Sequence, residues 1–139
     1  MTVVLDANIL IAALQPDHMH HHAVLTRLDR LPPDPEGKIA VVHRLTMAEV
    51  LVGYDDPIDQ SVLYKNLVEY GGLRIAQMQP DGEISLLVRA RQKTGVKMPD
   101  ACVLATAIAF NVSVMTFDKK LAKAAEQAGV NAFPLNTFH

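Results

Sequence analysis

The sequence predicts an α/β fold in which a mostly parallel central sheet carries helices on both faces. Short β-branched runs alternate with segments of helical pattern along the whole chain, as expected for a parallel sheet. Half of the residues are apolar, tryptophan is absent and aromatic residues make up 5%. The core must therefore consist mainly of Val, Leu, Ile and Ala. The 139 residues suit a single domain over 1–139, and no repeat or linker divides them.

The expected strands are short and rich in β-branched residues. They are Thr2–Leu5, Ile39–Val42, Leu73–Ile75 with a possible extension to Met78, Val112–Thr116 and a last candidate at Val130–Phe133. Apolar runs of this length between turn signals are typical of buried strands.

Helices are expected between these strands. The predicted ranges are Asn8–Leu14, Asp17 to about Leu31, Thr46–Val52, Asp55 to Gly71, Asp81–Lys93, Asp100–Phe110 and Asp118–Ala128. Asp17 is a candidate cap of the second helix. Gly95 closes the fifth helix, and Pro99 suits the first position of the sixth.

Composition and charge narrow the class of protein. The net charge of −2 argues against bulk electrostatic binding of nucleic acid, although a local basic patch remains open. Cys102 is the single cysteine, so an internal disulfide is excluded. The N-terminal segment carries Asp6 and lacks a basic region, so it is not typical of a signal peptide. No segment reaches membrane-spanning length without a charge. We therefore expect a cytoplasmic protein without a membrane partner.

Four carboxylates stand where apolar runs give way to predicted helices: Asp6, Glu49, Asp100 and Asp118. Each has a local explanation. Asp6 and Asp118 suit helix N-caps, and Asp100 lies in a first helical turn, where a carboxylate is stabilised by the helix dipole. Glu49 completes a capping box with Thr46.

Taken together, the four carboxylates predict a metal site. A parallel sheet brings the carboxyl ends of its strands, and the helix starts after them, to one edge. Carboxylates gathered there repel one another, and a divalent cation relieves the repulsion. Mg²⁺ is the expected ion because it prefers oxygen ligands and retains several waters, and Mn²⁺ is a plausible substitute.

The motifs around these acids resemble those of the PIN-domain ribonucleases, particularly the VapC-type toxins of toxin–antitoxin pairs. The matching segments are Asp6–Leu10, Thr46–Leu51, Met98–Ala101 with Ala105–Ala107, and Val114–Asp118, which together span almost the whole chain. Ala7 departs from the pattern, since family members often carry Ser or Thr there. The resemblance implies a single PIN-like domain.

The resemblance also implies an activity. It predicts a metal-dependent endoribonuclease in which Asp6 and Asp100 bind Mg²⁺ directly. Asp118 and Glu49 then bind a second ion or position the attacking water. Asn8 and Thr116 are candidate polar groups that support these carboxylates, although Thr116 is also an ordinary strand residue.

Partners follow from the same resemblance. Such toxins usually form homodimers and are neutralised by a small antitoxin that covers the active-site groove. The apolar stripe of Ile58, Val62, Leu63 and Leu67 suits either contact. Its simpler interpretation is an ordinary buried helix face.

Two further clusters have an open role. Arg89, Arg91, Lys93 and Lys97 precede Asp100 and are candidates for contacts to RNA phosphates, or form the solvated face of a helix. The run of His18, His20, His21 and His22 is best explained as an exposed helix start. His18 and His22 have the i, i+4 spacing of a transition-metal site, which is the alternative.

Two other functions are alternatives to the nuclease. A non-catalytic RNA-binding protein on the same fold would be expected to lose acids, whereas this chain retains all four. An Asp6-nucleophile phosphatase of the haloacid-dehalogenase type needs a second Asp two residues later, where this chain has Asn8. Both remain alternatives to the nuclease.

Overall fold

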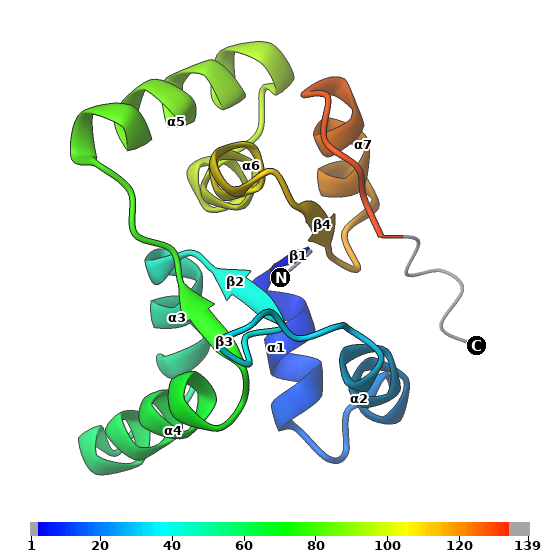
Figure 1. Ribbon diagram of the computed structural model, residues 1–139, viewed down its shortest axis with the longest axis vertical. Coiled ribbons are helices and arrows are strands. Elements are labelled where there is room, and N and C mark those ends of the chain that lie inside the picture. Colours follow the sequence, from blue (N-terminus) through cyan, green and yellow to red (C-terminus); the bar gives the residue numbers. More distant parts are fainter. Residues whose placement is uncertain (1–2, 134–139) are drawn as a thin grey trace.

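Four short strands form one all-parallel sheet in the order β3-β2-β1-β4 (Figure 1). They are β1 (Val3–Leu5), β2 (Ala40–Val42), β3 (Leu73–Ile75) and β4 (Ser113–Met115). This computed structural model describes residues 3–133, so Thr2 of the predicted first strand lies outside the described residues. The predicted α/β class with a parallel sheet is confirmed.

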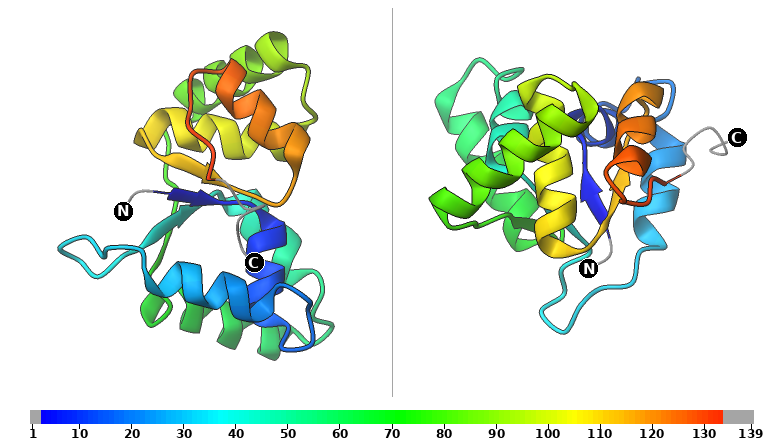
Figure 2. Two further views of the ribbon diagram at one scale, coloured as in Figure 1. Left: turned by 90° about the vertical axis from the view of Figure 1, so that its right-hand side faces the viewer. Right: turned by 90° about the horizontal axis from the view of Figure 1, so that it is seen from above.

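The helices lie in two layers, one on each face of the sheet (Figure 2). Helices α1 (Ala7–Leu14), α2 (His21–Asp29), α3 (Arg44–Leu51) and α4 (Pro57–Glu69) form one layer. Helices α5 (Pro80–Thr94), α6 (Met98–Phe110) and α7 (Lys119–Gln127) form the other. The prediction of helices on both faces is therefore correct.

The side-chain alternation of the strands produces two apolar clusters. Val3 and Leu5 point into the cluster that α1, α2 and α3 close, whereas Val4 between them points into the cluster of α5, α6 and α7. All three side chains are fully buried. This two-sided burial explains why the strands are continuous apolar runs rather than alternating patterns.

Two predicted helix starts are wrong. Residues 15–20 form successive turns in which His18 donates its backbone N–H to Gln15 and His21 donates to His18, so α2 begins at His21 and Asp17 does not cap it. Helix α3 begins two residues earlier than predicted, at Arg44.

The capping box predicted for Thr46 and Glu49 is also wrong. His43 caps α3, and its Nδ1 accepts the backbone N–H of Leu45 at 3.1 Å. Thr46 is therefore the third residue inside the helix and is buried, whereas Glu49 is exposed. Glu49 therefore has no capping role, and its exposed carboxylate is available for another function.

Two smaller expectations need adjustment. The last predicted strand, Val130–Phe133, is reduced to one parallel bridge between Val114 and Ala132. The stripe on α4 is not a buried face, because Ile58 is 72% and Val62 is 53% exposed and no residue of α4 is buried.

Gly95 ends α5 with φ 74°, as predicted, because this left-handed conformation favours glycine. Within residues 3–133, no helix combines the length and apolar character needed to cross a membrane.

Candidate active site

The candidate site lies where the strand order of the sheet reverses. β1 pairs with β2 on one side and with β4 on the other, so the connections after β1 and β4 leave the sheet side by side. In open α/β sheets ligands bind at this point, outside the carboxyl ends of the strands. Asp6 follows β1 directly, and Thr116 follows β4.

Asp6 is held by two hydrogen bonds of different origin. Its Oδ1 accepts the backbone N–H of Ala7 at 2.8 Å, which caps α1. Its Oδ2 accepts the Thr116 hydroxyl at 2.6 Å, a contact between residues 110 positions apart. The carboxylate is therefore fixed at the junction of β1 and β4.

The hydroxyl of Thr116 links three polar residues. While donating to Asp6, it accepts the backbone N–H of Asp118 at 3.0 Å and the Asn8 amide at 3.3 Å. A hydroxyl offers one donor and two acceptor positions, so all of its capacity is used. The Asn8 carbonyl in turn accepts the backbone N–H of Phe117 at 3.2 Å. Asn8 and Thr116 thus lie beside Asp6 and Asp118, and their role there stays a prediction.

Asp118 begins α7, as expected of an N-cap. Its Oδ1 accepts the backbone N–H groups of Lys120 and Leu121 at 2.8 and 3.3 Å. These bonds engage one carboxylate oxygen. No protein hydrogen bond to the other oxygen, Oδ2, is found among residues 3–133.

Asp100, in the first turn of α6, is electrostatically coupled to the other three acids. Burial raises its pKa above the usual 3.8, and the charges of Asp6, Asp118 and Glu49 raise the pKa further, against an opposing contribution from Lys97. The pKa of Asp6 is also raised, mainly by burial and to a smaller extent by Asp118, while its two hydrogen bonds lower it. All four predicted acids therefore share one electrostatic neighbourhood.

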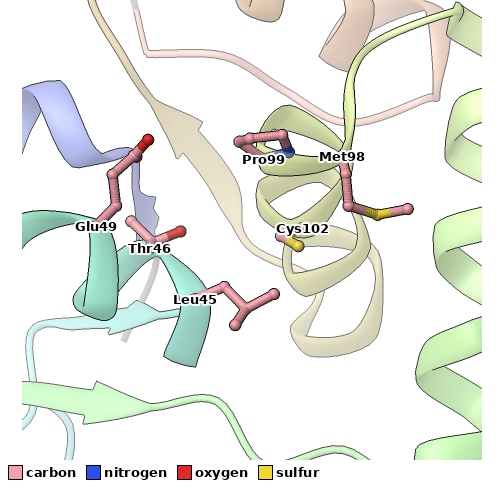
Figure 3. A pocket seen from close by; sticks show the side chains of 6 residues that line it. All are labelled: Leu45, Thr46, Glu49, Met98, Pro99 and Cys102. Carbon is pink, nitrogen blue, oxygen red and sulfur yellow. The ribbon is translucent and has the colours of Figure 1, made fainter.

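Glu49 borders a small apolar pocket between α3 and α6. The pocket has a volume of about 140 Å³ and is lined by Leu45, Thr46, Glu49, Met98, Pro99 and Cys102. Figure 3 shows Glu49 and Thr46 on α3 facing Pro99 and Cys102 on α6. Cys102 is buried, as expected of a small core residue. The pocket is thus bordered by Glu49 on one side and by the two residues before Asp100 on the other.

The donor chemistry of this site fits a hard divalent cation. All four side chains offer carboxylate oxygens, and a cation would reverse the repulsion that raises the pKa values of Asp6 and Asp100. Among residues 3–133, no three Asp, Glu, His or Cys side chains are close enough to form a ready ligand cage. Carboxylate oxygens are ligands that hard cations such as Mg²⁺ use together with retained waters.

The basic cluster is spread over the end of α5 and the start of α6. Arg89, Arg91, Lys93 and Lys97 are all exposed. Arg91 donates to the backbone carbonyl of Val96 at 3.1 Å, which ties down the α5–α6 connection. Lys97 caps α6 and acts electrostatically on Asp100. Of the four, Lys97 is the one whose charge reaches the acids.

Two features escaped the sequence analysis. His43, 1% exposed, donates from Nε2 to Glu83 Oε2 at 3.1 Å and so joins α3 to α5 behind the pocket. Arg44 contacts the other oxygen of Glu83 at 3.1 Å. His43 follows β2 directly, just as Asp6 follows β1. Its position after a predicted strand could therefore have identified it as a candidate residue. The second feature is a ring contact at Phe117, described below.

Comparison with protein families decides the classification. The family model of the PIN domain matches residues 3–127. The chain belongs to the PIN domain family. No curated protein matches the sequence.

Solved structures reproduce the fold of this PIN domain across almost its whole length. FitAcB from Neisseria gonorrhoeae is 19% identical with a TM-score of 0.69, covering 98% of this chain and 99% of the other. A toxin–antitoxin complex from Klebsiella pneumoniae is 24% identical with a TM-score of 0.69, covering 87% and 91%. VapC20 from Mycobacterium tuberculosis, described as a sarcin–ricin loop cleaving toxin, is 15% identical with a TM-score of 0.67, covering 88% and 95%. At these identities the likeness establishes the fold.

Proposed function

We propose that this PIN domain is a Mg²⁺-dependent endoribonuclease that acts as the toxin of a type II toxin–antitoxin pair. The observation that carries the proposal is the coupling of Asp6, Glu49, Asp100 and Asp118 at the strand-order reversal. Four acids that repel one another at a ligand-binding edge suit a bound cation and an anionic substrate. VapC20, which shares the fold, is described as cleaving RNA of the sarcin–ricin loop.

The four acids have two kinds of role in the proposed mechanism. Asp6, at the end of β1, and Asp100, in the first turn of α6, would hold Mg²⁺ directly, or Mn²⁺ in its place. Asp118 and Glu49 would hold a second ion or the attacking water through their oxygens. Hydrogen bonds of the Thr116 hydroxyl and the Asn8 amide hold Asp6 and the start of α7 in fixed positions relative to each other. When bound, the metal lowers the pKa of water and neutralises charge on the scissile phosphate.

The substrate strand would be held by charge beside the acids. Lys97 stands before Asp100 on α6, and we assign it to a phosphate next to the scissile bond. Arg89, Arg91 and Lys93 would extend this contact along α5. Because the net charge is −2, we expect a restricted RNA target rather than tight binding of any RNA.

The same proposal includes two protein partners. An antitoxin segment would cover the acidic groove, and two copies of the chain would form a homodimer in the cytoplasm. The FitAcB and Klebsiella pneumoniae structures share the fold, and the latter is a toxin–antitoxin complex. Inhibition by an antitoxin segment would then act by excluding RNA and metal from the acids.

An RNA cleavage assay tests the enzymatic part. Purified wild type, Asp6→Asn and Asp100→Asn are incubated with total RNA in Mg²⁺, in Mn²⁺ and in chelator. We expect cleavage by wild type with either ion, no cleavage in chelator, and loss of cleavage in both variants because each removes a metal-binding charge.

Asp59→Asn is the matched control. Asp59 is an exposed acid on α4, so this variant should cleave like wild type. Cleavage that survives both active-site substitutions would contradict the site assignment. A phosphoryl group bound covalently to Asp6 would favour the phosphatase alternative, and RNA binding without cleavage would favour a non-catalytic protein.

A further inference from the structure

A ring stack joins the histidine run to the catalytic edge. The rings of His20 and Phe117 are stacked, with centroids 4.6 Å apart and an interplanar angle of 27°. The His18 ring lies 5.7 Å from that of His20 at 45°. The histidines of the 15–20 turn therefore have a defined arrangement, which an unstructured exposed helix start would not require.

The stack is attached directly to the acidic network. Phe117 lies between Thr116 and Asp118 in the chain, and its backbone N–H donates to Asn8 at 3.2 Å. Its neighbour Thr116 contacts Asp6. The position of the Phe117 ring is thus set by the same hydrogen bonds that hold the catalytic carboxylates.

The rings retain accessible surface and unused nitrogens. His18, His20 and Phe117 are half-buried, and Met19 between the two histidines is 87% exposed. Nδ1 of His18 accepts the backbone N–H of His20 at 3.0 Å. Within residues 3–133, neither ring nitrogen of His20 has a hydrogen-bond partner. Burial and hydrogen bonding of the imidazole therefore do not explain why His20 stands here.

A transition-metal site does not explain the cluster either. His21 Nδ1 contacts the backbone carbonyl of Ala12 at 2.8 Å, and His22 is exposed in the first turn of α2. No group of three metal-binding side chains forms among the described residues. The i, i+4 pairing of His18 and His22 considered from the sequence thus gains no support.

We propose that the stacked His20 and Phe117 rings, edged by His18, form a platform on which a base of the RNA strand stacks next to the scissile phosphate. The inference rests on the proposed ribonuclease function. Unpaired RNA bases are commonly bound by stacking on Phe, Tyr, Trp or His. Stacking on an outer face of this ring pair would supply affinity without positive charge, which suits a chain of net charge −2.

Binding by four variants tests the platform. All carry Asp100→Asn so that RNA remains intact, and the probe is a fluorescein-labelled single-stranded RNA 20-mer of random sequence, titrated in Mg²⁺ and followed by anisotropy. Relative to Asp100→Asn alone, adding His20→Ala should raise Kd about 5- to 100-fold, the effect of losing one stacked base. Adding His20→Phe should restore binding, because it keeps the stack without the imidazole. Adding His22→Ala should change nothing, because His22 is exposed and outside the stack.

The readouts distinguish stacking from other roles. Thermal unfolding of each variant identifies any loss of fold, and the aromatic rescue by His20→Phe separates stacking from charge or hydrogen bonding. With a probe in which the bases are replaced by abasic sites, the difference between His20 and His20→Ala should disappear.

Several outcomes would overturn the platform: equal Kd for His20 and His20→Ala, failure of His20→Phe to rescue, an undiminished difference on abasic RNA, or absence of RNA binding altogether. The ribonuclease proposal fails separately if RNA binds in a His20-dependent way but the chain with Asp100 intact never cleaves it.

Discussion

Thr116 has a larger role than its size suggests, because one hydroxyl joins the ends of β1 and β4. Its donated bond lowers the pKa of Asp6, and its accepted bonds hold Asn8 and Asp118, the N-cap of α7. Groups that support a metal ligand typically contribute about 10- to 100-fold to metal affinity or activity. The contribution of Thr116 can be isolated because Val has nearly the same shape.

Thr116→Val should therefore lower cleavage about 10- to 100-fold. Without the hydroxyl, the already raised pKa of Asp6 rises further, so a proton competes with the metal at higher pH. The acidic limb of the profile of kcat/KM against pH should shift to higher pH. Thr116→Ser, which keeps the hydroxyl, should resemble wild type. An unchanged acidic limb in Thr116→Val would show that the hydroxyl does not act through Asp6.

At the scale of elements, α3 depends on a histidine that local rules do not favour as a cap. His43 is buried, caps α3 through Nδ1 and reaches Glu83 on α5 through Nε2. Burial lowers its pKa from 6.5, and the partly opposing effect of Glu83 does not restore it. The neutral ring therefore connects α5 to α3, the helix that carries Glu49.

This gives a pH dependence of stability with a definite sign. Because the folded pKa of His43 is below 6.5, the unfolded chain takes up the proton first. The stabilising contribution is present above pH 6.5 and is lost as pH falls toward the folded pKa. Urea unfolding at about pH 7.5 and about pH 5.5 should show a smaller decrease of the free energy of unfolding in His43→Asn than in wild type.

Two comparisons make the His43 experiment specific. Asn retains a cap acceptor and does not titrate, and His43→Ala should be about 1 kcal/mol less stable than His43→Asn at both pH values because it lacks the cap. The difference between wild type and His43→Asn cancels the other titrating groups, including the active-site acids. An equal pH dependence in the two proteins would contradict the assignment.

At the scale of the whole molecule, apolar residues that lie outside the core favour a protein–protein interface. α4 packs against β3 at the edge of the sheet opposite β4, and it exposes Ile58, Val62 and Tyr64. Exposed aliphatic and aromatic side chains on one element are typical of protein interfaces. Because Asp6 and Asp118 follow β1 and β4, at the other side of the sheet from β3, an antitoxin over these acids would leave α4 open to a second copy.

The double variant Ile58→Asp with Val62→Asp should therefore be monomeric. In light scattering, the molar mass of wild type should be about twice the chain mass of 15.2 kDa, and that of the variant should equal the chain mass. Both side chains are already exposed, so the variant should remain folded. Ile84→Asp on α5, also exposed, is the control and should remain dimeric. A monomeric wild type, or a dimeric double variant, would rule out α4 as the dimer interface.

Local sequence patterns were sufficient for much of this protein. β-branched runs marked the buried strands, Asp6 and Asp118 were recognised as helix caps, and Gly95 as a helix end. These features depend on neighbours within a few residues, so a single chain segment encodes them. The order of strands and helices then determined a parallel sheet with Asp6, Asp100 and Asp118 after its strands or at its helix starts, whereas Glu49 lies near the end of α3.

Only the tertiary structure decided the contacts between distant segments. The Thr116–Asp6 bond joins residues 110 positions apart, the His43–Glu83 bond joins residues 40 apart, and His20 meets Phe117 from the other end of the chain. It also decided that Thr46 is buried inside α3 rather than capping it, and that α4 exposes Ile58 and Val62 of its stripe while Leu67 packs against the core. Spacing along one helix or strand reports local periodicity, whereas these contacts depend on which elements pack together.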